Sequence, residues 1–414
     1  MNDSSHSKNT TGLIHHPYTP PGGFQAPQPG VFKASTVYFP TVADMRQREW
    51  KDKSGYTYGL HGTPTTYLLE EKLCTLEGGD QCLLVPSGLA ALTTVALALL
   101  QTGDELLLPD NVYGPNKAFA EVELRHFGIT HQVYDAMDPD DLSRKITERT
   151  RLVWLEAPGS VSMEFCDLPE LVRRCQARGV WSALDNTWGA GLAFQPFDLL
   201  GQAAQGGTAL AVDISAHALT KYPSGGGDVL MGSIVTRDPA LHMKIKLCHM
   251  RLGLGVAAND AETVLRSLPS MALRYQAHDA TARRLAKWWQ VQAQCAQLLH
   301  PAFAGAPGHA HWQALCDAAP GTGLAAGLFS VLIDARYSQA QVDAFCNGLK
   351  LFKIGFSWGG PVSLVVPYDL ASLRKRPSAH LVPGSLVRFS IGLESAHDLL
   401  LDLNQAMQAH LPAA

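Results

Sequence analysis

Several features are scarce in this sequence, and each shortage excludes a class of protein. Its eight cysteines include no close pair such as C-x-x-C, so we expect reduced thiols in a cytoplasm and no disulfide framework. No apolar run is long enough to span a membrane, and the longest, at residues 95–100, predicts a buried helix. The first residues lack the basic and then apolar order of a signal peptide. These shortages favour a cytoplasmic protein without a membrane partner.

Charge is also scarce and nearly balanced. Charged residues form 17% of the chain and the net charge is −4, so no basic face for nucleic acid is expected. The hydrophobic content of 46% over 414 residues is typical of a globular protein with a large core and room for two domains.

Two familiar ligand motifs are missing. The glycine run at 225–227 lacks both the Gly-Lys-Ser/Thr ending of a P-loop and G-x-G-x-x-G spacing, so we interpret it as a flexible turn. His309, His311 and Cys316 follow a loop-like stretch, and no second ligand cluster lies at zinc-site spacing. We interpret the histidines as solvated loop residues and predict no metal site.

The pattern along the chain predicts an arm and two domains. Residues 1–64 are rich in Pro, Gly, Thr and His without a sustained period, apart from a short helix expected at 42–51. Short apolar strands then alternate with helices over 65–270, which predicts a large α/β domain with a mostly parallel sheet. Its expected strands are 82–85, 105–108, 130–134, 152–156, 180–184, 209–214 and 229–235.

The pattern of expected helices and strands changes after residue 270 and predicts a smaller α+β domain over 271–414. A long helix is expected at 273–299, followed by a Gly/Ala/Pro-rich loop to about residue 327. The remaining expected elements are strands at 329–333, 364–366 and 386–391 and helices at 339–349 and 396–409.

Polar side chains follow two expected strands of the large domain. Asp185 directly follows the strand expected at 180–184, and Lys221 follows the strand expected at 209–214. Parallel α/β sheets bind ligands beyond the carboxyl ends of their strands. A lysine and an aspartate placed there suit pyridoxal phosphate, because the amine forms a Schiff base with its aldehyde and the carboxylate pairs with its ring nitrogen.

Other residues fit the same cofactor, although each has a plainer interpretation. Gly88 and Leu89 follow a strand and open a helix, where backbone amides suit a phosphate, or form an ordinary turn. Thr220 offers the phosphate a hydroxyl or is structural. Tyr113 opens a helix after a strand, where it stacks on a cofactor ring or packs under a loop.

Arg388 lies inside an apolar strand and therefore needs a buried anion. Its planar fork suits an amino-acid carboxylate, and an internal Asp or Glu is the alternative. Ser357 and Trp358 precede two glycines, in a loop that either approaches a ligand closely or forms a turn around an anchored tryptophan.

From about Tyr56 to the C-terminus, the segments taken in order resemble the cystathionine γ-synthase/β-lyase family of pyridoxal-phosphate enzymes. The resemblance rests on residues 58–65, 76–79, 86–88, 184–188, 220–222 and 387–394. Two further segments, 155–160 and 356–360, are similar to the β-lyase branch of this family.

This resemblance implies an aspartate-aminotransferase-like fold of type I, with a mostly parallel seven-stranded sheet and a smaller C-terminal domain. It implies that Lys221 binds the cofactor and moves a proton, Asp185 holds the ring nitrogen, and Tyr113 stacks on the ring. Gly88, Leu89 and Thr220 would bind phosphate. Arg388 would bind the substrate carboxylate with Ser357 and Trp358. Tyr58 would reach the phosphate of a neighbouring subunit in a homotetramer of catalytic dimers.

The activity implied is β-elimination of L-cystathionine to L-homocysteine, pyruvate and ammonia, a step of transsulfuration in methionine biosynthesis. Cystathionine γ-synthase or γ-lyase chemistry and a cysteine or cystine β-lyase stay open. A non-catalytic binding protein with the same fold is the alternative from another class.

Two positions depart from the family pattern. Leu60 occupies the place of an arginine common in the family, and Ala218 occupies the place of a serine. Both changes remove expected phosphate ligands. His61 is a candidate substitute, although a neutral imidazole is a poorer partner for an anion.

Overall fold

The computed structural model describes residues 11, 14–15, 18–19, 21–23, 25–202, 206–317, 319–370, 374 and 378–412. The chain forms two compact units, Met1–Gly30 and Val31–Ala414, and every element named below belongs to the second. In the described part of the chain, no helix has the length and apolar character needed to cross a membrane. All eight cysteines are free thiols.

A seven-stranded sheet has the strand order β1-β7-β6-β5-β4-β2-β3. Only β7 runs antiparallel to its neighbours β1 and β6 among the described strands, so the expected mostly parallel sheet is confirmed. The strands are β1 (Gln81–Val85), β2 (Glu105–Pro109), β3 (Thr130–Tyr134), β4 (Thr150–Glu156), β5 (Trp181–Asp185), β6 (Ile214–Ala218) and β7 (Gly232–Thr236).

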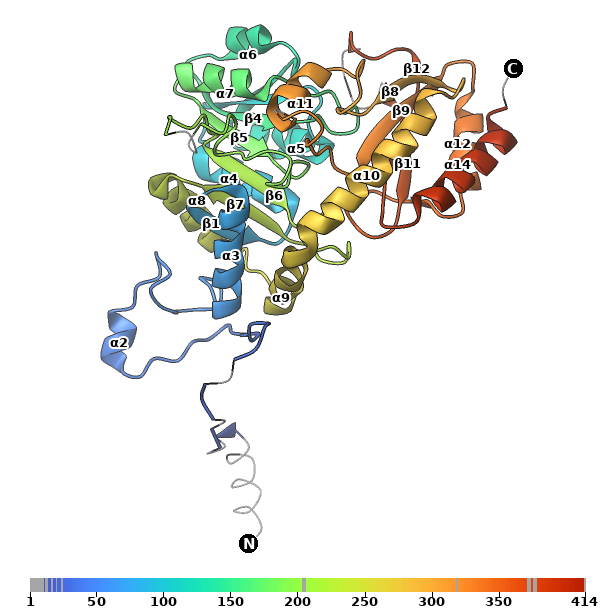
Figure 1. Cartoon of the computed structure of the whole chain (residues 1–414). Helices are drawn as coiled ribbons and strands as arrows, with labels where there is room; N and C mark the ends of the chain where they lie inside the picture. Colours follow the sequence, from blue (N-terminus) through green and yellow to red (C-terminus); the bar gives the residue numbers. More distant parts are fainter. Residues whose placement is uncertain are drawn as a thin grey trace. The chain divides into compact units, whose positions relative to one another are not determined.

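Helices cover both faces of this sheet because successive strand residues point to opposite faces. Leu83 and Val85 of β1 pack in one core with α4 (Gly88–Leu99) and α8 (Pro239–Leu252). Cys82 and Leu84 pack in another core with α3 (Pro64–Glu77), α6 (Pro139–Lys145) and α7 (Leu168–Ala177). Figure 1 shows α6 and α7 side by side next to β4 and β5.

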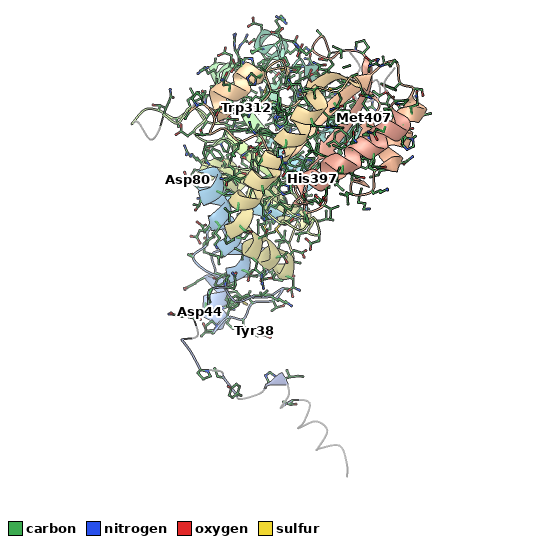
Figure 2. The ribbon with its side chains drawn as sticks, turned by 45° about the vertical axis from the view of Figure 1, so that its right-hand side comes forward. Tyr38, Asp44, Asp80, Trp312, His397 and Met407 are labelled. Carbon is green, nitrogen blue, oxygen red and sulfur yellow. The ribbon has the colours of Figure 1, made fainter. Side chains whose placement is uncertain are left out.

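A second sheet has five strands in the order β10-β11-β12-β9-β8, and only the β10–β11 pair is parallel. The helices α10, α12 and α14 share one apolar core with it. Met407 of α14, which Figure 2 labels, belongs to this core. These elements are β8 (Cys295–Leu299), β9 (Leu328–Asp334), β10 (Lys353–Ile354), β11 (Leu364–Tyr368), β12 (Gly384–Ser390), α10 (Met271–Gln290), α12 (Gln339–Gly348) and α14 (Ala396–His410).

The residues between Val31 and α3 form an extended segment with one short helix, α2 (Val42–Arg46), which is shorter than expected. This segment exposes several apolar side chains, including Tyr38 at 93%. Figure 1 shows α2 standing apart from the two sheets, and Figure 2 labels Tyr38 and Asp44, of which Asp44 belongs to α2.

Three sequence expectations are wrong in position. Residues 209–212 are not a strand, because Leu210 and Val212 bond to the turn at Pro196 and Leu199, so β6 begins only at Ile214. The helix expected to reach residue 299 ends at Gln290, because residues 295–299 pair with β9 as β8. The loop expected up to residue 327 contains the helix α11 (His309–Cys316). The domain boundaries at 64/65 and 270/271 stay predictions.

Candidate active site

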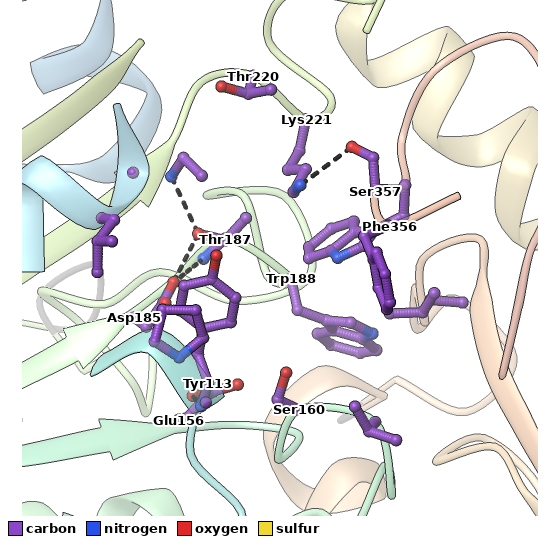
Figure 3. Close-up of a pocket in the computed structure, with 18 of the residues that line it drawn as sticks. Tyr113, Glu156, Ser160, Asp185, Thr187, Trp188, Thr220, Lys221, Phe356 and Ser357 are labelled. Atoms are coloured by element: carbon purple, nitrogen blue, oxygen red, sulfur yellow. Dashed lines mark hydrogen bonds between the residues drawn. The ribbon is translucent and has the colours of Figure 1, made fainter. Parts of the chain in front are cut away.

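A cavity of about 470 Å³ lies where strands β4, β5 and β6 end. Residues from both sheets line it, and they include every predicted site residue except Tyr58. The residues brought together are Gly88, Leu89, Tyr113, Asp185, Thr220, Lys221, Ser357, Trp358 and Arg388. Figure 3 shows Lys221 and Ser357 on one side of the cavity, with Asp185 and Tyr113 across from them.

Lys221 projects into this cavity from the turn that follows β6. Its Nζ donates a hydrogen bond to Ser357 Oγ at 3.1 Å, drawn in Figure 3, and lies 5.5 Å from the centroid of the Trp358 ring. Burial, and then the nearby Arg388 cation, lower the pKa of Lys221 to about 8. A substantial fraction of this amine is therefore neutral near physiological pH and can act as a nucleophile or base.

Asp185 is the last residue of β5 and is half-buried at the cavity wall. Thr187 donates to its carboxylate from Oγ1 at 2.5 Å and from the backbone amide at 3.1 Å. Burial nevertheless raises the pKa of Asp185, and the two hydrogen bonds oppose that rise. A half-buried carboxylate of this kind gains most from a cation, which is what a protonated ring nitrogen supplies.

Glu156 is a site residue that our sequence reasoning missed. It ends β4 in register with Asp185, and its Oε2 accepts the Tyr113 amide proton at 2.8 Å. Burial, and then the neighbouring Asp185 carboxylate, raise the pKa of Glu156 well above its ordinary value. Glu156 fixes the Tyr113 turn through this hydrogen bond, and its raised pKa disfavours a second negative charge beside Asp185. Asp185 was selected because it lies at the carboxyl end of a parallel strand, and the same argument applies to Glu156.

The start of α4 provides an anion-binding turn. Ser87 caps the helix, and its Oγ accepts the Ala90 amide proton at 3.0 Å. The amides of Gly88 and Leu89 have no hydrogen-bond partner among the described residues. A Cβ on Gly88 would lie 2.4 Å from Ala218 Cβ, so only glycine fits here. Free amides at a helix start fit a phosphate group.

Thr220 lies beside this turn, but its hydroxyl already has partners. Its Oγ1 accepts the Met231 amide proton at 3.3 Å and donates to the Met231 carbonyl at 3.4 Å. Thr220 thus lines the cavity, and a bond to phosphate would replace or share these contacts.

Arg388 lies in the middle of β12 and is 7% exposed. Burial lowers the pKa of its guanidinium. The described residues provide it with neither an ion pair nor a hydrogen-bond acceptor, so the internal carboxylate considered from the sequence is not found among them. The guanidinium carbon lies 5.2 Å from the centroid of the Tyr368 ring. A buried cation of this kind fits an anionic ligand.

Tyr58 does not line the cavity of its own chain. It is 47% exposed and pairs with Thr36 in an isolated bridge, so its reach into a neighbouring subunit stays a prediction. Among the described residues, no group of three or more His, Cys, Asp or Glu side chains is arranged to hold a metal. The expectation of solvated loop histidines is wrong, because His309 and His311 lie on α11 and are half-buried, and His309 Nδ1 lies 2.9 Å from the Pro301 carbonyl.

A half-buried lysine with a lowered pKa, a half-buried carboxylate and free amides at a helix start are the parts of a site for an aldehyde cofactor with a nitrogen ring and a phosphate. The chain belongs to the Cys/Met metabolism PLP-dependent enzyme family, whose model matches residues 10–408. Pyridoxal phosphate is therefore its cofactor, and the residues around the cavity fit that molecule.

The chain is similar to enzymes with more than one reaction. It is 34% identical to cystathionine beta-lyase of Bordetella avium, over 98% of this chain and 99% of that one. It is 30% identical to L-methionine gamma-lyase of Pseudomonas putida, over 96% of this chain and 97% of that one. The solved cystathionine gamma synthase of Xanthomonas oryzae pv. oryzae, in complex with aminoacrylate and cysteine, superposes with a TM-score of 0.80 at 28% identity, over 93% and 94%.

Proposed function

We propose that this chain catalyses PLP-dependent β-elimination of L-cystathionine to L-homocysteine, pyruvate and ammonia. The observation that carries the proposal is the cavity in which the neutralisable amine of Lys221 faces Asp185 and Tyr113, close to the unpaired guanidinium of Arg388. Amino-acid chemistry needs these groups, because the substrate brings an α-carboxylate, an α-amine and an acidic α-proton. The cofactor supplies an electron sink for the bonds that break at the α- and β-carbons.

Arg388 orients the substrate by its α-carboxylate, because a buried guanidinium without an internal acid binds an anion bidentately. Lys221 takes the proton from the α-carbon, since its lowered pKa of about 8 leaves a fraction of the amine neutral and able to accept it. Ser357 and Trp358 contact the Lys221 amine from one side, and these contacts restrict the orientations that the amine can adopt toward the substrate.

The cofactor is held by residues of the seven-stranded sheet. Asp185 binds its ring nitrogen, Tyr113 packs on its ring, and Lys221 links to its aldehyde. The amides of Gly88 and Leu89, with Thr220, bind its phosphate. The free amides and the glycine-only contact at Gly88 support this assignment.

β-Chemistry is favoured over γ-chemistry by the segment at Ser160 and by Trp358, both of which line the cavity. Relatives named cystathionine beta-lyase, 34% identical in Bordetella avium and 32% in Salmonella typhimurium, add to this support. The γ-lyase relative and the γ-synthase structure keep γ-elimination and γ-replacement as the alternatives.

Product analysis tests the proposal. The purified protein with bound cofactor is incubated with L-cystathionine, and keto acids and thiols are identified by mass spectrometry. Equal amounts of pyruvate and homocysteine are expected. The appearance of 2-oxobutyrate and cysteine would assign γ-lyase chemistry, and the absence of any product from well-folded protein would reject cystathionine as the substrate.

We further propose a homotetramer in which Tyr58 completes the site of a neighbouring subunit. The segment before α3 supports this assembly, because it exposes Val31, Phe32, Tyr38, Val42 and Met45. Mixed tetramers of Tyr58→Phe and Lys221→Ala chains should regain activity, since some sites then carry neither lesion. Hybrids that assemble but stay inactive would reject the shared site. Eight free thiols support a reducing compartment such as the cytoplasm.

A further inference from the structure

We propose that Tyr368 is a positioning residue, whose ring holds Arg388 so that its N–H groups stay free for the α-carboxylate of the substrate. This inference rests on the carboxylate role of Arg388 in the proposed function. It adds a residue to which neither the sequence motifs nor the family resemblance assigned a role.

The guanidinium of Arg388 is unusual in what surrounds it. It has five N–H donors and is 7% exposed, yet no acceptor for them is found among the described residues. Because Arg388 lines the cavity, these donors are available to a ligand there. The contact that the structure does provide is the face of Tyr368, 5.2 Å from the guanidinium carbon.

A ring face is suited to this task. It attracts a cation through its quadrupole and occupies none of the N–H donors. A carboxylate in the same place would hold the arginine more firmly but would also occupy the fork. Tyr368 therefore restrains the side chain while leaving its edge available to an anion.

Arg374 shows the opposite arrangement in the same chain. Its guanidinium bonds to the carboxylate of Glu164 and to Ser162 Oγ at 2.8 Å, and it lies 3.8 Å from Asp110. The Arg374 side chain is also largely buried, with a side-chain exposure of 7%, but internal acids occupy its donors. The difference is what separates a structural arginine from one prepared for a ligand.

Tyr368 is itself held in place by two contacts. As the last residue of β11 it pairs with Leu386 of β12, two positions before Arg388. The ring of Phe356 packs against it edge-on, with centroids 6.2 Å apart. Figure 3 shows Phe356 beside Ser357, the residue that bonds to Lys221. Tyr368 thus links the carboxylate-binding arginine to the loop that contacts the lysine.

The experiment distinguishes the contribution of the Tyr368 ring from that of its hydroxyl. It also distinguishes the contribution of the ligand's carboxylate from that of its amine. Tyr368→Leu removes the ring, and Tyr368→Phe keeps it. The probes are L-alanine, which has an α-carboxylate but no leaving group, and ethylamine, which lacks the carboxylate. Their dissociation constants are measured with the holoenzyme from the change in cofactor absorbance, and thermal unfolding is recorded for each variant.

Tyr368→Leu should raise the Kd of L-alanine roughly tenfold, the loss expected for a partly buried cation–π contact. The Kd of L-alanine for Tyr368→Phe should stay within about twofold of the wild-type value. Ethylamine should bind with the same Kd to the wild type and to both variants. With cystathionine, KM should rise in Tyr368→Leu while kcat is largely kept. If Tyr368→Leu does not fold, Tyr368→Met, which fills the space without a ring, gives the same comparison.

Three results would overturn the inference. An equal loss in Tyr368→Phe would assign the effect to the hydroxyl. An equal loss for ethylamine would show a general disturbance of the cavity. Unchanged L-alanine binding in Tyr368→Leu, together with weakened binding in Arg388→Leu, would remove Tyr368 from the role and leave that of Arg388 intact. Unchanged binding in Arg388→Leu itself would instead reject the carboxylate assignment of the proposed function.

Discussion

The cavity has two walls that differ in how their charged groups are satisfied. On the wall from the seven-stranded sheet, the carboxyl groups of Asp185 and Glu156 accept hydrogen bonds from Thr187 and Tyr113. On the wall from the five-stranded sheet, the guanidinium of Arg388 has no polar partner among the described residues and rests on the Tyr368 ring.

We propose that this difference corresponds to two kinds of ligand. The first wall is ordered by its own hydrogen bonds, which suits a cofactor that stays bound through many reaction cycles. The second wall keeps an unpaired buried cation, and desolvating a cation without a partner is unfavourable. An arriving carboxylate relieves that penalty, so the second wall is suited to a substrate that comes and goes.

Loss of the lysine tests the first wall and should have the largest effect. Lys221→Ala should lower pyruvate formation by at least about a thousandfold, because the base and the covalent attachment are lost together. Borohydride reduction followed by peptide mass analysis should find no linked cofactor. Lys287→Ala, an exposed lysine of α10, is the matched control. A cofactor linked to another lysine in an active Lys221→Ala protein would contradict the assignment.

Loss of the guanidinium tests the second wall. Arg388→Leu should cost about 2–5 kcal/mol in kcat/KM for cystathionine, the scale for removing a buried charge partner. The kcat/KM of Arg388→Lys should lie between those of the wild type and Arg388→Leu, because lysine keeps the charge but loses the bidentate fork. Arg284→Leu on the exposed face of α10 serves as the control. Unchanged kcat/KM in folded Arg388→Leu would remove the proposed difference between the walls.

The pH dependence of cofactor attachment sharpens the account of Lys221. Only the neutral amine attacks an aldehyde, and the pKa of Lys221 is lowered from 10.5 to about 8. The rate at which pyridoxal phosphate attaches to the apoprotein should rise roughly tenfold per pH unit below pH 8 and level off above it. Absorbance-detected mixing between pH 6 and 9.5 measures this. A rate still rising steeply at pH 9.5 would indicate an ordinary lysine.

The smallest effect is expected at Glu156, because the raised pKa of its carboxyl group favours the neutral form that glutamine imitates. Glu156→Gln should change activity only a few-fold, because an amide oxygen still accepts the Tyr113 amide proton. Glu156→Leu should cost about 1–3 kcal/mol of unfolding free energy, since that buried donor loses its acceptor.

Stability against pH gives a second measurement for Glu156. Its pKa is raised above the ordinary 4.5, so wild-type stability is greatest below that value and is lost as rising pH ionises the buried group. The melting temperature of apo Glu156→Gln, relative to the wild-type apoprotein, should therefore increase from pH 5 to pH 8. A difference that stays constant over this range would mean that Glu156 does not have a raised pKa.

Much of this architecture could be predicted from local sequence patterns. Short apolar runs separated by helical periods predicted the mostly parallel sheet, and Thr130–Tyr134 was predicted with its observed bounds. Asp185 and Lys221 were identified because they follow such runs. Local patterns failed at residues 209–212, where an apolar run bonds to the turn at 196–199, and at 295–299, where a helical pattern continues into β8.

The sequence by itself determined which residue types follow the strands, and with them the family and its cofactor. Only the tertiary structure decided which partners those residues meet. Ser357 reaches Lys221 across 136 positions of the chain, and Glu156 lies beside Asp185 because β4 and β5 pair in that register. Whether a buried arginine finds an internal acid, as Arg374 does, or only a ring, as Arg388 does, depends on packing between distant segments, and no local pattern encodes that packing.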